Sequence, residues 1–228
     1  MKYADDTVIV GLLDDNENSE QNYRSEIESF VKWCEENFLN LNVKKTKEMI
    51  IDFRRKRQEI EPIIINEEAV QIVENYKYLG CIIDNSLKGS DHVKKIAKKA
   101  NQRMYFVRKL KKVGVNKKIL SNFYKSIVES MISYCMSCWY GNTSKADRKK
   151  LKRMINTARR LGCDVTKLDQ MYKMSLKNKY SKILKDSSHP LFNCIEELKS
   201  GKRLNIKYCR TTRMQNTFVP ASIKLYNM

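Results

Sequence analysis

Residues 3 to 13 read Tyr3-Ala4-Asp5-Asp6-Thr7-Val8-Ile9-Val10-Gly11-Leu12-Leu13. Val, Ile and Thr at this density favour a β-strand, and adjacent aspartates favour a tight turn because their side chains bond the nearby backbone. The stretch therefore predicts a β-hairpin with Asp5 and Asp6 at its tip. Two adjacent carboxylates repel each other, and a divalent cation such as Mg²⁺ relieves that repulsion. The alternative is an exposed acidic turn without a metal.

The composition limits the class of protein. The chain has 228 residues, 42% of them hydrophobic and 31% charged, which excludes wholesale disorder and allows one or two domains with a core. No apolar run reaches the roughly 18 residues of a membrane span, and no basic segment followed by an apolar one suggests a signal peptide. Seven scattered cysteines fit reduced thiols. We expect an intracellular protein of the cytoplasm or nucleus, not secreted and without a membrane partner.

The charge indicates the kind of partner. The chain carries 45 Lys and Arg against 26 Asp and Glu, a net charge of +19. Such an excess implies a polyanionic partner. Nucleic acid fits better than a membrane surface, because the basic residues are spread over several segments and not concentrated on one amphipathic helix.

The first part of the chain predicts an α+β arrangement with a small antiparallel sheet and one packed helix. Apolar residues recur at helical spacing from Tyr23 to Phe38. Strands are expected over residues 49–53, 63–65, 69–73 and 76–83, where β-branched and aromatic residues gather. Hairpin, helix and further strands in this order are typical of an α+β fold.

From Asp91 onward the pattern changes to helix, and three helices at this spacing predict a small bundle. Gly114 is expected to end the first helix, Asn116 to cap the second, and Ser144 and Gly162 to bound the third. Each of the first and third helices has an apolar stripe opposite a basic face. The basic residues that we expect to bind nucleic acid are Lys94, Lys95, Lys98, Lys99, Arg103, Arg148, Lys149, Lys150, Lys152 and Arg153. Residues 164–228 are expected to form a helical or irregular tail.

Three motifs resemble, in order, those of reverse transcriptases of the non-LTR (LINE-type) retrotransposon branch. Tyr3-Ala4-Asp5-Asp6-Thr7 resembles the catalytic hairpin, Leu41-Asn42-Val43-Lys44-Lys45-Thr46-Lys47 a basic motif near the incoming nucleotide, and Tyr76-Lys77-Tyr78-Leu79-Gly80-Cys81-Ile82-Ile83 the primer-grip hairpin. The resemblance implies the C-terminal portion of such an RNA-directed DNA polymerase: part of the palm over 1–88, a helical thumb over 89–163, and a tail over 164–228.

The resemblance also implies roles for residues. Asp5 and Asp6 would hold Mg²⁺ for two-metal nucleotidyl transfer. Lys45, or its rival Lys47, would act near the dNTP triphosphate. Residues 78–80 (Tyr78, Leu79 and Gly80) would lie against the primer end, and the basic helices would hold an RNA template in an RNA–DNA or DNA duplex by its phosphates. The fingers and the first catalytic aspartate would lie outside this chain, so the chain alone is expected to be inactive.

Two alternatives remain open. One is a non-catalytic basic remnant that binds nucleic acid. The other rests on residues 117–161, which resemble a segment assigned to the N-terminal region of AlkB-type dioxygenases. Dioxygenase chemistry itself is disfavoured, because an iron(II) facial triad needs two histidines and a carboxylate, and neither His92 nor His189 begins a His-x-Asp motif. Cys135 and Cys138 are expected to be ordinary thiols, since a zinc site needs further ligands nearby.

Overall fold

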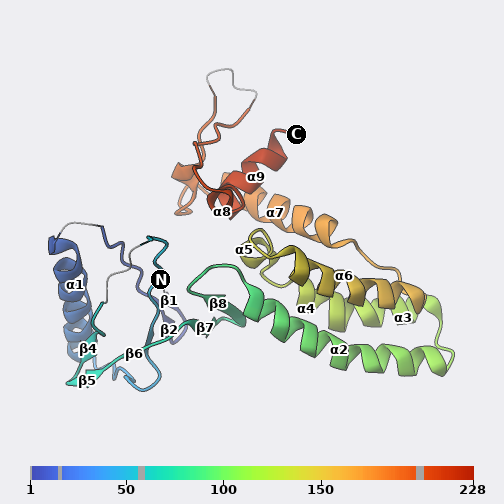
Figure 1. Ribbon diagram of the computed structural model, residues 1–228, viewed down its shortest axis with the longest axis horizontal. Coiled ribbons are helices and arrows are strands. Elements are labelled where there is room, and N and C mark those ends of the chain that lie inside the picture. Colours follow the sequence, from blue (N-terminus) through green and yellow to red (C-terminus); the bar gives the residue numbers. More distant parts are fainter. Residues whose placement is uncertain (1, 15–16, 56–59, 199–202) are drawn as a thin grey trace. The chain divides into compact units, whose positions relative to one another are not determined.

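The computed structural model describes residues 2–14, 17–55, 60–198 and 203–228. The chain divides into two compact units, Met1–Tyr76 and Lys77–Met228. We call them the N-terminal unit and the helical unit, and Figure 1 shows their elements. Helices together with small sheets make the fold α+β at a coarse level. The three-part division predicted at residues 88 and 163 stays a prediction.

The N-terminal unit consists of one long helix and short strand pairs. Its elements are β1 (Lys2–Tyr3), β2 (Asp6–Thr7), α1 (Glu17–Glu36), β3 (Lys47–Glu48), β4 (Ile64–Ile65), β5 (Glu68–Ala69) and β6 (Gln71–Ile72). Strands β1 and β2 form an antiparallel hairpin, β4 and β5 a second, and β3 pairs with β6 in parallel. The core is small: Ile27 of α1 is buried together with Ile63, Ile65 and Val70.

The hairpin at the start is confirmed, but the predicted strand after it is wrong. Strand β2 ends at Thr7, and residues 8–14 have no regular structure. Val10 is 69% exposed and Leu12 94% exposed. β-branched residues form a strand only where a partner backbone and a packed face are present, and the side chains of Val10 and Leu12 lie mainly in solvent. The strand predicted over residues 49–53 is likewise wrong, since strand β3 comes before it, at Lys47–Glu48, and residues 49–53 have no regular structure. In the described part of the chain, the strands form separate two-stranded pairs and not one antiparallel sheet.

The helical unit contains the larger core. Its elements are β7 (Asn75–Tyr78, which crosses the unit boundary), β8 (Cys81–Asp84), α2 (Ser90–Lys112), α3 (Lys117–Tyr124), the π-helical turn η1 (Lys125–Glu129), α4 (Ser130–Ser133), α5 (Met136–Trp139), α6 (Lys145–Arg160), α7 (Leu168–Leu184), the 3-10 turn η2 (Phe192–Cys194), α8 (Thr212–Gln215) and α9 (Phe218–Tyr226). Helix α2 packs along α6 and against α3 and α4 (Figure 1). Helical structure is therefore present in all three stretches that the sequence predicts as helices between Asp91 and Gly162.

The ends of these helices follow local sequence signals. The Asn116 side chain accepts a hydrogen bond from the Lys118 N–H, and the Ser144 hydroxyl accepts one from the Asp147 N–H. Both predicted N-caps are thus confirmed. Gly162, with φ of +92°, follows α6 as expected. The second helix is less regular than predicted, because η1 interrupts it and Cys135 takes a left-handed conformation (φ 49°).

The tail folds back on helix α7. Tyr180 of α7, Leu204 and Ile223 of α9 form a separate buried cluster. Between α7 and α8, the described residues include the short 3-10 turn η2 and are otherwise irregular apart from one β-bridge between Glu197 and Leu204.

Candidate nucleic-acid interface

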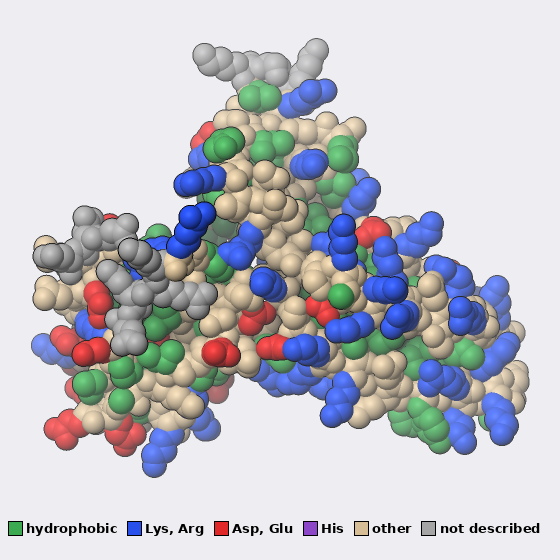
Figure 2. All heavy atoms as spheres, viewed as in Figure 1, with side chains coloured by type: hydrophobic (Ala, Val, Ile, Leu, Met, Phe, Trp, Pro, Cys, Tyr) green, Lys and Arg blue, Asp and Glu red, His purple; other side chains and the backbone are tan. Residues whose placement is uncertain are grey.

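Charge is distributed very unevenly between the two units. The N-terminal unit has 10 Lys and Arg against 17 Asp and Glu, a net charge of −7. The helical unit has 35 Lys and Arg against 9 Asp and Glu, a net charge of +26. Figure 2 shows basic side chains over much of the visible surface of the bundle helices. The whole positive excess of the chain therefore belongs to the helical unit.

Helix α2 presents most of its predicted basic residues to solvent. Lys95, Lys98 and Lys99 are exposed, and no carboxylate of the described residues forms an ion pair with them. Lys94 is exposed too but pairs with Asp91 at 2.8 Å, and this hydrogen bond raises the pKa of Lys94. Arg103 is anchored at one end, because its Nη1 donates to the Ile127 carbonyl at 2.5 Å.

Helix α6 divides its basic residues between solvent and intramolecular contacts. Lys149 and Arg153 are exposed. Lys150 forms an ion pair with Asp147 at 2.8 Å, and the Lys152 ammonium lies 3.9 Å from the Asp169 carboxylate. Lys150 and Lys152 can still contact a phosphate, but the neighbouring carboxylates partly neutralise their charge.

Arg148 is placed differently from its neighbours. Its Nη2 donates to the carbonyls of Tyr140 and Gly141 at 3.0 and 2.9 Å. The guanidinium also lies 4.6 Å from the centre of the Tyr140 ring, within the range of a cation–π contact. Arg148 thus supports the segment before α6, although the sequence grouped it with the binding residues.

Asp147 fixes the start of α2 against the start of α6. Its carboxylate is buried and accepts hydrogen bonds from the hydroxyls of Ser90 and Ser144, both at 2.8 Å, and from the Lys150 ammonium. Burial acts to raise the pKa of Asp147, but these hydrogen bonds outweigh it and the pKa is lowered. Sequence reasoning missed this role, although the Ser-x-x-Asp spacing from Ser144 to Asp147 is a capping signal.

The primer-grip-like residues form the tight turn between β7 and β8. Leu79 and Gly80 both have positive φ, 43° and 84°, as a two-residue hairpin turn requires. The Tyr134 hydroxyl donates to the Leu79 carbonyl at 2.6 Å, and a Cβ on Gly80 would lie 3.3 Å from the Tyr134 ring. The turn that begins after Tyr78 is therefore packed against a side chain of its own unit.

The hairpin carboxylates and the predicted lysines have different surroundings. Asp5 lies in the turn and Asp6 opposite Tyr3, and both are exposed. Lys45 is exposed, whereas the Lys47 ammonium donates to the Lys44 carbonyl and to Gln71 Oε1, at 2.9 and 2.7 Å. In the described ranges no hydrogen bond or ion pair joins these lysines to the hairpin, and no group of three His, Cys, Asp or Glu side chains could hold a metal ion. A Mg²⁺ site at Asp5 and Asp6 stays a prediction.

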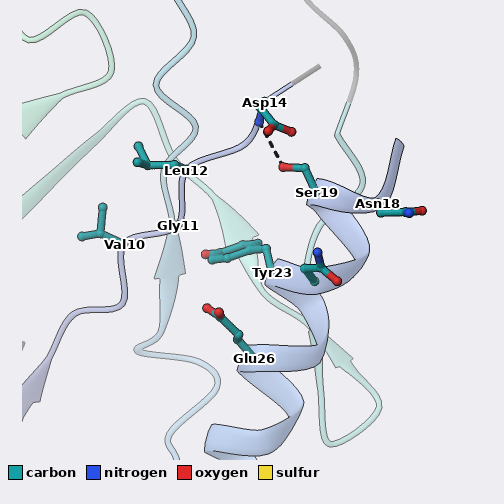
Figure 3. Close-up of a pocket in the computed structure, with 9 residues that line it drawn as sticks. Val10, Gly11, Leu12, Asp14, Asn18, Ser19, Tyr23 and Glu26 are labelled. Atoms are coloured by element: carbon teal, nitrogen blue, oxygen red, sulfur yellow. Dashed lines mark hydrogen bonds between the residues drawn. The ribbon is translucent and has the colours of Figure 1, made fainter. Parts of the chain in front are cut away.

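A polar hollow lies between α1 and the segment that follows the hairpin (Figure 3). Gly11 permits the approach, since a Cβ there would lie 2.3 Å from the Tyr23 ring. The Asp14 N–H donates to the Ser19 hydroxyl at 3.0 Å. Burial, with Glu48 nearby, raises the pKa of Tyr23. The residues that line the hollow do not include Asp5 or Asp6, so it does not extend the predicted metal site.

Comparisons with known proteins bear on one part of the helical unit. Residues 90–130, from the start of α2 to the start of α4, match the family described as "Alkylated DNA repair protein alkB homolog 8, N-terminal". Comparison with curated proteins and with solved structures finds no match. Within the described residues, no helix is both long and apolar enough to cross a membrane.

The reverse transcriptase interpretation is therefore corrected. The family match lies with the AlkB homolog 8 N-terminal region, and nothing in the comparisons points to a reverse transcriptase or a retrotransposon. The physical reason for the error is that Tyr3-Ala4-Asp5-Asp6 specifies a tight turn between two short strands, which many unrelated hairpins share. The AlkB-type segment, expected over residues 117–161, lies further towards the N-terminus, at residues 90–130.

Proposed function

We propose that the helical unit is a non-catalytic module that binds nucleic acid through its phosphates, with α2 and α6 as the contact helices. The observation that carries the proposal is the net charge of +26 of the helical unit, in which 17 of the 35 Lys and Arg lie on α2 and α6. Asp147 joins the starts of these two helices by hydrogen bonds. Lysines on a rigid surface release counterions when they meet a polyanion, and this supplies affinity without sequence specificity.

The family match supports the same proposal. The matched protein is described by name as an alkylated DNA repair protein, which acts on a nucleic acid, and the match covers α2 and α3. We propose that this shared segment holds the nucleic acid and does not perform the oxidation. Both histidines are engaged locally, since His92 Nδ1 accepts from the Ile82 N–H and His189 Nδ1 from the Leu191 N–H. This donor set does not fit an iron(II) facial triad.

A salt titration of the full chain tests the proposal. We expect binding of a labelled duplex of about 20 base pairs to weaken linearly in log–log form between about 50 and about 200 mM salt. Reversal of Lys98 and Lys99 to Glu should weaken binding and flatten the slope by about one unit for each phosphate that the variant no longer neutralises. The double variant Lys149→Glu and Arg153→Glu tests the contribution of α6 to affinity and salt slope in the same way.

The matched control is the double variant Lys32→Glu and Lys44→Glu. It changes the net charge of the chain by the same amount, but both residues are exposed in the N-terminal unit. It should leave the salt slope near that of the unmodified chain. Affinity that is indifferent to salt, or a control that weakens binding as much as the α2 variant, would contradict the proposal.

A further inference from the structure

Two adjacent aromatic side chains on α2 lie outside the core. Tyr105 is 52% exposed and Phe106 56% exposed, and neither belongs to the buried cluster of the helical unit. Their ring centres are 5.5 Å apart at an interplanar angle of 78°. Two large neighbouring rings with this exposure mark a candidate contact surface more strongly than a single exposed apolar residue.

The rings occupy the same face of α2 as its free lysines. Because residues four and seven positions apart lie on one side of a helix, Tyr105 is aligned with Lys98 and Lys109, and Phe106 with Lys99. The Lys109 ammonium lies 5.4 Å from the centre of the Tyr105 ring. The one acidic residue of α2, Asp91, lies near the opposite end of the helix, about 20 Å along the axis from the rings.

We infer that this face of α2 binds single-stranded nucleic acid, with bases stacked on Tyr105 and Phe106 and phosphates at Lys98, Lys99 and Lys109. The inference rests on the proposed function and narrows its ligand. Exposed aromatic rings flanked by cations suit a strand whose bases are unpaired, since every base offers a flat face for stacking. A duplex keeps its bases stacked on one another, so the rings would meet only its sugars and phosphates.

Other occupants fit this face less well. The centre of a protein–protein interface is depleted of lysine, whereas lysines flank both rings here. A second copy of the chain would place the same basic surface on both sides of a two-fold interface, so like charges would face each other. A polyanion that also carries aromatic bases complements both properties of the face.

The test compares two probes on the full chain: a labelled thymidine 20-mer and a labelled duplex of the same length. We expect the double variant Tyr105→Ala and Phe106→Ala to weaken binding of the single strand by about fivefold to about a hundredfold, the effect of removing the stacking on one or two rings. Binding of the duplex should change by less than about twofold, because the variant removes stacking and leaves the phosphate contacts in place. The salt slope should stay unchanged, since no charge is removed.

Two variants serve as controls. The exchange Tyr105→Phe with Phe106→Tyr keeps both rings and should retain the affinity for the single strand. Tyr208→Ala removes an 89% exposed tyrosine of the tail and should have no effect on either probe. The alanine variant is expected to keep its fold, because the rings are mainly exposed and alanine favours helix more than either aromatic residue; its helix content is measured by circular dichroism.

The outcomes separate this inference from the proposed function. The inference is overturned if the alanine variant keeps its affinity for the single strand, or if it loses equal affinity for both probes. In either case, salt-dependent binding of the duplex leaves the proposed function intact. No binding of either probe at low salt overturns both. Dimerisation that disappears in the alanine variant, without loss of single-strand affinity, would identify a second copy as the occupant and overturn the inference.

Discussion

The N-terminal unit carries a net charge of −7 and the helical unit one of +26, although they belong to one chain of +19. The total therefore understates the basic character of the part that we propose as the binding surface. In the helical unit, 17 of the 35 Lys and Arg lie on α2 and α6, helices of 23 and 16 residues that hold them at fixed spacing. In the N-terminal unit the strands are two residues long. Among the described residues, the long helices that are rich in basic residues at fixed spacing belong to the helical unit.

The cores of the two units also differ, in how completely their apolar side chains are buried. Ile27, Ile63 and Ile65 of the N-terminal unit remain 7–8% exposed, whereas Val93 and Ile132 of the helical unit are fully buried. A segment with few buried apolar contacts opens at a lower free energy than a well-packed core. The comparison thus predicts that the N-terminal unit unfolds before the helical unit.

The largest expected effect comes from the two cores. Ile132→Ala should lower the free energy of unfolding of the helical unit by about 4 kcal/mol, because the cavity lies in a fully packed region. Ile63→Ala should cost the N-terminal unit about 2 kcal/mol, since the small cluster around Ile63 can relax into the space that is left. Each unit has one tryptophan, Trp33 or Trp139, so urea denaturation of single-tryptophan variants made with Trp→Phe reports on each unit separately. If both isoleucine variants shift both tryptophan signals equally, the chain unfolds as one body and the comparison fails.

A smaller effect is expected at the polar junction of α2 and α6. Asp147→Ala should lower the free energy of unfolding of the helical unit by about 2–3 kcal/mol, because it leaves the Ser90 and Ser144 hydroxyls without their acceptor. The measurement is urea denaturation followed by Trp139 fluorescence. Asp164→Ala is the matched control: it breaks an ion pair with Lys125 whose aspartate side chain is 71% exposed, and it should change little. Equal losses of unfolding free energy in the two variants would contradict a stabilising role for Asp147 at this junction.

The smallest effect concerns pH. Burial, with Lys95 nearby, lowers the pKa of His92 below its ordinary 6.5. The unfolded chain therefore binds this proton more readily, and the contribution of His92 to stability is complete above about pH 6.5 and is lost as the pH falls towards the folded pKa. Protonation would also remove the acceptor of the Ile82 N–H. His92→Asn should flatten the loss of stability between about pH 7 and pH 5.5, measured by urea midpoints. A variant that keeps the same slope in that range would show that another group controls it.

Local signals in the sequence predicted the bundle helices and their caps. Contacts between residues far apart in the sequence could not be predicted. Asn116 and Ser144 could be assigned as caps because a cap depends on neighbours two or three positions away. Arg148 could not be separated from Lys149, since only the folded chain brings the Tyr140 and Gly141 carbonyls to its guanidinium. The hairpin at Asp5 was predicted from turn chemistry, whereas the assignment to a reverse transcriptase rested on the order of three short motifs, each of which also fits an ordinary turn or strand.

Gly141 has a consequence for the order in which the protein forms during its synthesis. A Cβ on Gly141 would lie 2.1 Å from the Asn216 carbonyl oxygen, so the backbone of the tail closes directly over this glycine. Domains generally fold as they leave the ribosome, N-terminal parts first, and the main core of the helical unit ends at Met171. The bundle can therefore fold while the last part of the tail is still untranslated. Until Asn216 is synthesised, the backbone at Gly141 is not covered by the tail. A chain that terminates before residue 216 would therefore keep this backbone exposed on an otherwise packed bundle.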